Sequence, residues 1–317
     1  MSDDTPAGAG PRVGFLGPEG TFHEQALLSQ PDLAAGELIP LPSIPDVFRA
    51  LEAEEIDLGF VGIENSIEGA VTVTVDALAF ETDLLIQREV VLGVQMNLLA
   101  PSGVGLGDVR RVLSMPVATA QCRTFLQREL AGVEQLEVAS TAEAARRVAG
   151  EDNDGHTAAI APAVAAKLYG LDVLANDIED HPDNATRFVV VAREGIPAPT
   201  GHDKTSIVVF QRANRPGSLL AILQEFAARS IDLTKLESRP TKKGLGQYCF
   251  VIDLEGHVGD PLVADCLRDL KSKVADVKFL GSYPAAGEHG PARRREFEQA
   301  WRDADAWVDS LRSQIVV

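Results

Sequence analysis

Three short polar motifs hold the side chains most able to do chemistry in this chain. The first is a loop of sequence Gly-Pro-Glu-Gly-Thr-Phe at residues 17–22, between an apolar run and a helix-like segment. The backbone N–H groups of such a loop and the start of the helix can hold an anion, for example a carboxylate. A nucleoside-triphosphate loop would have Lys and then Ser or Thr after its second glycine, whereas Thr21 and Phe22 stand here. A plain tight turn is the alternative interpretation.

The second motif follows directly after an apolar run at residues 58–61. It reads Glu-Asn-Ser-Ile-Glu-Gly at residues 64–69, and Thr74 and Asp76 come soon after it. Polar groups at the carboxyl end of a strand are where open α/β sheets bind ligands. The alternative is a loop rich in Ser and Asn that caps the next helix.

The third motif places a hydroxyl and a guanidinium at the start of an apolar run. Thr186 and Arg187 precede the sequence Phe-Val-Val-Val at residues 188–191, which is typical of a buried strand. Arginine is costly to bury without a partner. Either an anionic substrate or a structural salt bridge is therefore expected beside Arg187.

Neither histidine nor cysteine forms a metal-binding pattern. His23, His156 and His181 could act as acids or bases, but none stands at metal-ligand spacing from another His or Cys. His23 falls in the first turn of a predicted helix, where a surface or capping role is favoured over a contact with substrate. The three cysteines are too few and too widely spaced for a disulfide framework, which indicates a reducing compartment. No metal and no cofactor is predicted.

Net charge limits the classes of partner. The chain has 317 residues, with 47 acidic and 29 basic side chains, and its formal charge is −18. Such a chain repels polyanions, so nucleic acid is not an expected partner. An anionic metabolite can bind only where arginine or a helix N-terminus makes a locally positive pocket. No segment approaches the roughly 18 apolar residues of a membrane span, so we expect a cytoplasmic protein with no membrane partner.

The first two-thirds of the chain alternate short apolar runs with helix-like segments, which predicts an α/β domain at residues 12–194 after a disordered lead at residues 1–11. Capping pairs mark two helix starts, Thr21 with Glu24 and Ser140 with Glu143. Strands are predicted at residues 13–16, 58–61, 84–89, 94–99, 111–114, 135–139, 157–161 and 187–191.

A linker rich in Pro and Gly, at residues 195–202, separates this domain from a second one at residues 203–284. The second domain is predicted to follow the order βαββαβ, which is the ferredoxin-like arrangement and leaves a sheet edge for pairing with another copy. Its strands are predicted at residues 205–210, 233–239, 248–254 and 277–283, and its helices at residues 218–229 and 261–274. Residues 285–317 are predicted as a helical tail that packs against one of the domains through Phe297, Trp301, Trp307 and Leu311.

Together the three motifs resemble those of the prephenate dehydratases, in the same order and at similar separations. The second domain resembles the amino-acid-binding ACT domain of that family, through Asn-Arg-Pro-Gly-Ser-Leu at residues 214–219 and Glu-Ser-Arg-Pro at residues 237–240. The resemblance covers residues 12–283. It implies a catalytic domain of two α/β lobes, similar to periplasmic ligand-binding proteins, with the active site between the lobes and a regulatory ACT domain after it.

The resemblance also implies roles for individual residues. Thr186 matches the catalytic threonine of the family, and Arg187 matches the anchor of a substrate carboxylate. The other implied active-site residues are Glu64, Asn65, Ser114 and Gln121, and the implied substrate-binding positions are Thr21, Thr74 and Phe188. The implied effector site is formed by Asn214, Pro216, Gly217, Ser218, Leu219, Glu237, Ser238, Arg239 and Pro240.

The chain departs from the family's pattern at four positions. Many members have His where Met115 stands, Gln where Val117 stands and an acidic residue at Ala139, so these positions are not expected to be essential. Ser218 stands where an alanine is usual, a change that can alter effector affinity without removing the site.

For function, the resemblance implies that prephenate is converted to phenylpyruvate, carbon dioxide and water. Phenylalanine is expected to bind between two ACT domains of a homodimer or homotetramer and to regulate the enzyme. Two alternatives stay open. The substrate could be arogenate, which carries an amino group in its side chain, or the protein could be a non-catalytic sensor of an aromatic or amino acid.

Overall fold

A computed structural model describes residues 10–150, 155–211, 216–242, 244, 246–287, 302–304 and 306–315 of the chain. The chain divides into two units. One comprises Met1–Ala77 and Val90–Ala192, and the other comprises Leu78–Glu89 and Arg193–Val317. In the described part of the chain, no helix is long and apolar enough to cross a membrane.

The first sheet of the first unit has the strand order β2-β1-β3-β11-β5, with the short β4 paired to β3. These strands are β1 (Arg12–Leu16), β2 (Glu37–Leu41), β3 (Leu58–Asn65), β4 (Gly69–Ala70), β5 (Leu85–Gly93) and β11 (Ala185–Ala192). Helices of this lobe are α1 (Phe22–Leu28), α2 (Pro31–Ala34), α3 (Ile44–Glu52) and α4 (Thr72–Asp76), and a π-helical turn follows at Ala77–Glu81. Buried Phe15, Phe60 and Phe188 lie in one core cluster of this lobe, because the apolar strands β1, β3 and β11 lie next to one another.

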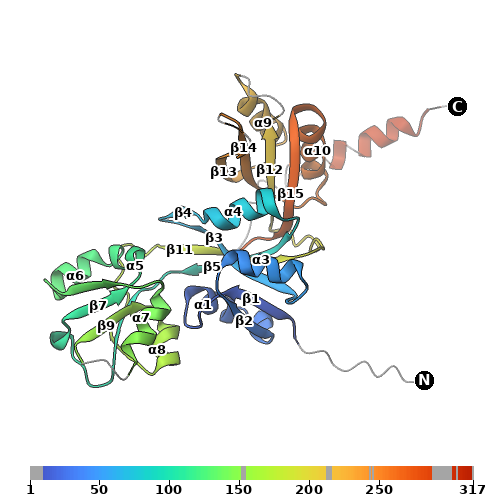
Figure 1. Cartoon of the computed structure of the whole chain (residues 1–317). Coiled ribbons are helices and arrows are strands. Elements are labelled where there is room, and N and C mark those ends of the chain that lie inside the picture. Colours follow the sequence, from blue (N-terminus) through green and yellow to red (C-terminus); the bar gives the residue numbers. More distant parts are fainter. Residues whose placement is uncertain are drawn as a thin grey trace, which may run out of the picture. The chain divides into compact units, whose positions relative to one another are not determined.

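The second sheet of the first unit has the strand order β10-β6-β9-β7-β8. Its strands are β6 (Asn97–Ala100), β7 (Arg111–Ser114), β8 (Glu134–Glu137), β9 (Thr157–Ala161) and β10 (Asp172–Ala175). Its helices are α5 (Pro116–Ala120), α6 (Arg123–Glu129), α7 (Thr141–Val148) and α8 (Ala163–Tyr169), with a 3-10 turn at Leu106–Asp108. Two separate core clusters contain alternate residues of β6 and β9, so both faces of this sheet are buried. Figure 1 shows this lobe in green beside the blue sheet of the same unit.

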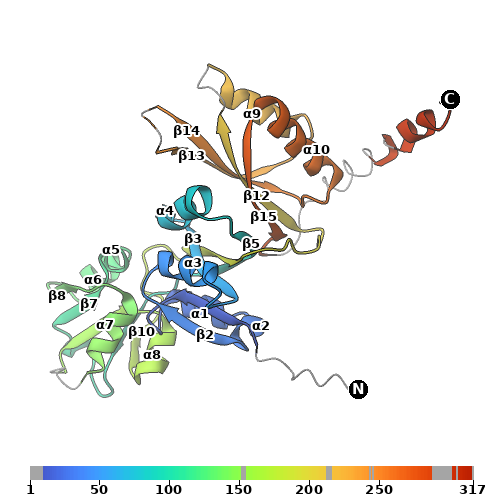
Figure 2. The same cartoon turned by 45° about the vertical axis from the view of Figure 1, so that its right-hand side comes forward.

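The second unit contains an antiparallel sheet of order β13-β14-β12-β15. Its strands are β12 (Asp203–Gln211), β13 (Leu233–Pro240), β14 (Tyr248–Glu255) and β15 (Ala275–Pro284), and its helices are α9 (Ser218–Ala227) and α10 (Pro261–Asp269), which continues into a π-helical turn at Leu270–Val274. The helices and one face of the sheet share a core that includes Ile207, Phe226, Ile252 and Cys266. Both helices lie on the same side of the sheet in Figure 2. This is the ferredoxin-like βαββαβ arrangement that the sequence predicted, and the mixed α/β fold class is confirmed.

The start of β5 is fixed within the second unit rather than the first. Lys204 on β12 pairs with the buried carboxylate of Glu89 at 2.8 Å. Gly281 on β15 approaches the backbone of Ile86 so closely that a Cβ at Gly281 would overlap its carbonyl oxygen. The first half of β5 is therefore packed against the ends of β12 and β15.

Two edge strands are absent from the sequence expectations. β2 contains Pro40, which argues against a central strand, but β2 lies at the edge of its sheet, where a missing N–H is tolerated. The short β10 lies at the edge of the other sheet and pairs antiparallel with β6.

The C-terminal tail contains helical residues, in agreement with the sequence. The expected docking through its aromatic side chains is not seen where the structure describes it, because Trp307 is 62% exposed and Leu311 is 45% exposed. Phe297 and Trp301 lie outside the described residues.

Replacement of Gly281 by alanine tests the close approach of β15 to β5. The backbone at this position has φ +146°, and the added Cβ would collide with backbone atoms of Ile86 that cannot rotate away. We expect Gly281→Ala to lower the free energy of unfolding by about 2–4 kcal/mol. Gly107→Ala is the matched control, because a Cβ there meets nothing within 4 Å. Thermal unfolding measures both variants. Equal midpoint temperatures for Gly281→Ala and Gly107→Ala would show that the close approach of Gly281 to Ile86 does not contribute to stability.

Candidate active site

The antiparallel pairing of β3 with β11 brings together two of the polar motifs. In this register Thr186 lies opposite Asn65, and Arg187 lies opposite Glu64. These residues lie at the carboxyl end of β3 and near the start of β11, and about 120 residues of chain separate the two strands. The second and third polar motifs, which are distant in the sequence, therefore lie side by side because β3 and β11 pair.

Asn65 is the centre of a hydrogen-bond network. Its side-chain Nδ2 donates to Thr186 Oγ1 at 2.9 Å and to Asn184 Oδ1 at 2.9 Å. Its Oδ1 accepts the backbone N–H groups of Ile67 and Glu68, each at 3.0 Å. Because both the oxygen and the nitrogen of this amide form hydrogen bonds, the orientation of the amide is fixed. Its nitrogen is therefore the atom that faces Thr186 and donates to it. In this hydrogen bond Thr186 Oγ1 is the acceptor, so its own proton is not used.

The network continues into the second lobe through Gln121. Asn184 Nδ2 donates to Gln121 Oε1 at 2.9 Å, and Gln121 Nε2 donates to Glu68 Oε1 at 3.3 Å. Asn184 is 2% exposed and Gln121 is 8% exposed, so these amides are hydrogen-bonded in a buried setting. Asn184 was not predicted from the sequence. The signal that could have found it is its position two residues before Thr186, at the entry to a buried strand.

Arg187 and Glu64 form a loose ion pair at this end of the sheet. Arg187 Nη1 lies 3.4 Å from Glu64 Oε2, and the two side chains are 11% and 34% exposed. A tight charge-assisted hydrogen bond is typically about 2.7–2.9 Å long. The 3.4 Å separation is longer than that, so the pair with Glu64 is a weak one. Both partners that the sequence allowed for Arg187 are thus compatible with the geometry.

Four other predicted residues are engaged with the backbone or the core. Thr74 Oγ1 donates to Gly62 O at 2.6 Å, and Ser114 Oγ donates to Ile160 O at 2.8 Å. Thr21 caps α1 by accepting Glu24 N at 3.4 Å, and Phe188 is fully buried in the sheet core. The structure thus brings Glu64, Asn65, Gln121, Thr186 and Arg187 into one polar cluster, whereas direct ligand contact by Thr21, Thr74, Ser114 and Phe188 stays a prediction.

The loop at residues 17–22 favours the plain-turn interpretation. The carboxylate of Glu24 accepts the Gly20 N–H, so a side chain of the same helix already occupies a donor that an anionic ligand would need. Thr21 and Glu24 therefore act as the capping pair that the sequence predicted.

His23 has neither the surface nor the capping role that the sequence favoured. Its Nε2 accepts the backbone N–H of Gly62 at 3.2 Å, and its ring meets Phe188 edge-on with centroids 5.0 Å apart. Burial of the ring lowers the pKa of His23 from 6.5 to about 4. The imidazole is therefore neutral near pH 7.

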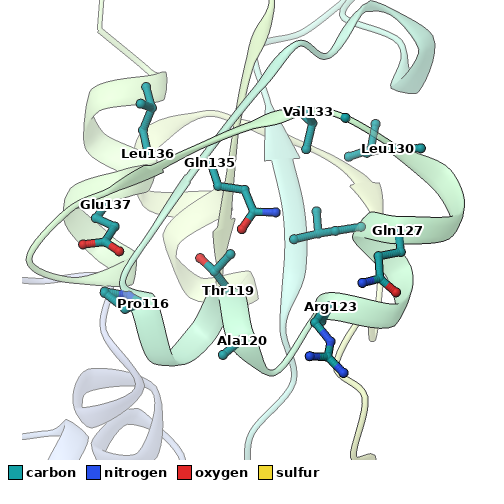
Figure 3. A pocket seen from close by; sticks show the side chains of 13 residues that line it. Pro116, Thr119, Ala120, Arg123, Gln127, Leu130, Val133, Gln135, Leu136 and Glu137 are labelled. Atoms are coloured by element: carbon teal, nitrogen blue, oxygen red, sulfur yellow. The ribbon is translucent and has the colours of Figure 1, made fainter.

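A hollow of about 460 Å³ lies elsewhere in the second lobe, between α5, α6 and β8. Figure 3 shows Pro116 and Glu137 at one end of this hollow and Arg123 and Gln127 at the other. None of the predicted active-site residues lines it. The hollow is therefore distinct from the polar cluster. Within the described part of the chain, no group of three or more His, Cys, Asp or Glu side chains is placed to hold a metal ion.

The predicted effector residues lie around the start of α9 and along β13. Pro216 and Gly217 are exposed, and Gly217 has φ +83° immediately before α9. On β13, Arg239 pairs with Glu237 at 2.7 Å, whereas Ser238 and Pro240 project from the opposite face of the strand. Asn214 lies outside the described residues.

Comparisons with known proteins agree with this arrangement. The family model described as prephenate dehydratase matches residues 13–196, and that of the ACT domain matches residues 205–272. A prephenate dehydratase of Mycolicibacterium vanbaalenii is 41% identical over 316 residues, which cover 95% of this chain and 98% of that protein. The crystal structure of prephenate dehydratase from Arthrobacter aurescens in complex with L-Phe is 40% identical, covers 95% of this chain and 99% of that one, and superposes with a TM-score of 0.85. A structure of GqqA, described as a novel type of quorum quenching acylase, is 29% identical, covers 87% of this chain and 98% of that one, and has a TM-score of 0.78.

The lowered pKa of His23 predicts a specific dependence of stability on pH. Between pH 6.5 and about pH 4 the unfolded chain binds a proton at His23 that the folded chain does not bind. The free energy of unfolding should therefore fall as the pH is lowered through this window, by a His23 contribution on the order of 3 kcal/mol, and this contribution should level off below it.

Urea unfolding of the wild type and of His23→Gln, measured from pH 7 to pH 4, isolates this contribution. We expect the difference in unfolding free energy between the two proteins to shrink as the pH falls, because glutamine does not titrate. Curves that run parallel across the whole range would show that His23 is not protected from protonation.

Proposed function

The chain belongs to the prephenate dehydratase family, and on that basis we propose that it converts prephenate to phenylpyruvate, carbon dioxide and water, with Thr186 and Arg187 as the main catalytic residues. The observation that carries this proposal is the hydrogen bond from Asn65 to Thr186 beside the ion pair of Arg187 with Glu64. Together these two interactions place a hydroxyl that can donate a proton, and a cation that can hold a carboxylate, at the same end of the sheet.

The reaction makes the ring of the substrate aromatic. The bond from the ring to one carboxylate breaks and releases carbon dioxide, its electron pair enters the ring, and the C–O bond of the ring hydroxyl breaks on the opposite carbon. The departing oxygen takes up one proton and leaves as water. The enzyme has to bind the anion, orient the ring and supply a proton to the leaving oxygen, which is work for positioning and hydrogen bonds.

Thr186 is placed to help the hydroxyl leave. A free threonine hydroxyl is a poor acid, so its contribution depends on the oxygen of the substrate becoming basic as its bond to carbon breaks. Asn65 Nδ2 donates to Thr186 Oγ1. This hydrogen bond strengthens as Thr186 transfers its proton to the substrate, because Oγ1 then becomes more negative. The amide thus stabilises the transition state more than the ground state, as catalysis requires.

Arg187 gives the anionic substrate a local positive charge within a chain of formal charge −18. Its guanidinium can bind a carboxylate through two parallel hydrogen bonds. Glu64 lies 3.4 Å from Arg187 Nη1 and limits the orientation of the guanidinium. Gln121 and Asn184 extend the polar cluster and fix Asn65 from the other side. Thr21, Thr74, Ser114 and Phe188 contribute by holding the walls of the site.

Two substitutions at Thr186 test the role of its hydroxyl, because one removes the hydroxyl and the other removes only the methyl group. Thr186→Val keeps the shape and removes the hydroxyl, and we expect kcat for phenylpyruvate formation to fall on the order of 100- to 1000-fold with little change in KM. Thr186→Ser keeps the hydroxyl and should stay within about tenfold of the wild type. Steady-state assays with purified protein and no added cofactor measure both. Near-normal turnover by Thr186→Val would rule out this assignment.

L-Phenylalanine is proposed as the effector, bound by the ACT domain at an interface between two copies of the chain in a cytoplasmic homodimer or homotetramer. β13 is an edge strand, and Leu220, Leu236 and Tyr248 expose 59%, 44% and 46% of their surfaces. Leu236 and Tyr248 lie on the helix-bearing side of the sheet, next to that edge. An exposed apolar surface beside an unpartnered edge is what a second copy would cover. The A. aurescens relative, solved with L-Phe, supports the choice of effector.

Alanine substitution of Glu237, Ser238 and Arg239 together tests the effector site. We expect the L-phenylalanine concentration for half-maximal effect to rise at least on the order of tenfold, because an allosteric coupling is lost with the contacts that the effector makes. Turnover without effector should persist. Arg268→Ala is the control, since its ion pair with Asp265 lies on the exposed surface of α10. An unchanged response to L-phenylalanine in the triple variant would place the effector elsewhere.

The alternatives are decided by the same assay. Arogenate carries an amino group in the side chain, so turnover of arogenate but not of prephenate would make the protein an arogenate dehydratase. Tight binding of either compound without turnover would make it a sensor. The pairing of Asn65 with Thr186 favours the enzyme, because a sensor has no need of a hydroxyl that is held by a donor and left free to donate.

A further inference from the structure

Gly62, three residues before Asn65, lies in a gap between the partner strands of β3. The pairing of β3 with β1 ends at Phe60, and the pairing with β4 involves only Glu64 and Asn65. Buried backbone groups need hydrogen-bond partners even where a neighbouring strand is missing. At Gly62 two side chains take that place: His23 Nε2 accepts its N–H at 3.2 Å, and Thr74 Oγ1 donates to its carbonyl oxygen at 2.6 Å.

The register of β3 with β11 shifts at the same point. Arg187 lies opposite Glu64, but the next residue of β11, Phe188, lies opposite Gly62. Ile63 is therefore an extra residue in β3, which makes a β-bulge. A bulge sets the direction of the side chains that follow it, and a slip of one residue would turn them to the other face of the sheet. The pairing of Asn65 with Thr186 depends on this bulge.

His23 is closely fitted to the bulge. Its ring packs edge-on against Phe188 at 5.0 Å and 81°, and Phe188 stacks on Phe60 at 5.2 Å. A Cβ at Gly62 would lie 3.4 Å from His23 Nε2 and 3.8 Å from the Phe188 ring, so both rings lie within van der Waals reach of this position. The lowered pKa of His23 agrees with an Nε2 that accepts a hydrogen bond and a proton on Nδ1.

We propose that His23 is a positioning residue for the reaction, which acts by holding Gly62 through Nε2 and so fixes the bulge that sets Asn65 against Thr186. Thr74 holds the other side of the same peptide group. Neither side chain has to touch the substrate for this role. The inference rests on the proposed function of Thr186 and Asn65, and it assigns to His23 a task that its place in the first turn of α1 does not reveal.

Two matched pairs of variants separate the hydrogen bonds from the packing. His23→Phe keeps a ring and removes the acceptor, whereas His23→Gln places an amide oxygen near the position of Nε2. Thr74→Val removes the hydroxyl, whereas Thr74→Ser keeps it. We expect His23→Phe and Thr74→Val to lower kcat on the order of 10- to 100-fold, with KM within about threefold. Each conservative variant should lose less kcat than the variant with which it is paired.

Hydrogen–deuterium exchange at the Gly62 amide provides a readout that does not depend on activity. We expect fast exchange in His23→Phe and protection in the wild type and in His23→Gln. Wild-type kcat in His23→Phe, equal impairment of His23→Gln and His23→Phe, or an unchanged Gly62 amide in His23→Phe would each overturn the proposal. If His23→Phe does not fold, His23→Leu, which also lacks the acceptor, takes its place. If the wild type does not turn over prephenate, the proposed function fails, and the exchange comparison still supports or overturns the hold of His23 on Gly62.

Discussion

The antiparallel pairing of β3 with β11 is the constraint on which the rest of the site depends. β3 ends at Asn65, within the second polar motif. After β4 and β5 of the same sheet, the chain forms the second lobe and then returns to the first sheet as β11. Only this return places Thr186 opposite Asn65 and Arg187 opposite Glu64. Because both strands are apolar and buried on the core side of the meeting point, the pairing is stabilised by the core, and the polar groups are held at its end.

Burial makes the polar cluster rigid as well as costly to disturb. Asn65, Asn184 and Gln121 form a chain of amide hydrogen bonds, and each amide that loses a partner would leave a buried polar atom unsatisfied. Such a network restricts the Asn65 amide to one orientation, and its hydrogen bond to Thr186 is fixed with it. The lower effective dielectric also strengthens the attraction between Arg187 and a carboxylate relative to water. Burial and hydrogen bonding at this end of the sheet thus both fix the polar side chains and strengthen their electrostatic interactions.

Much of this could be predicted from local sequence. β7 and β9 begin and end where the apolar runs indicated, and the order of the second domain follows from its periodicity. The paired motifs were found because Thr186 and Arg187 stand out at the entry to an apolar strand. Gly62 and Asn184 were not found, and His23 was expected to have a surface or capping role, because their contacts arise from a bulge and from distant segments. Bulges and contacts between distant segments produce no periodic pattern in the sequence. The edge position of β2, which makes Pro40 acceptable, also cannot be predicted from the sequence.

The fold alone does not determine the reaction, since a structure described as an acylase shares it at 29% identity. Nucleophilic attack on an amide would require a base that takes the proton of the attacking hydroxyl. In the described part of the chain, the hydroxyl of Thr186 is hydrogen-bonded to Asn65, an amide nitrogen that donates and cannot accept a proton. The acceptor nitrogen of His23 is engaged by Gly62. This geometry agrees with the proposed role of Thr186, in which its hydroxyl donates a proton to the oxygen that leaves prephenate as water.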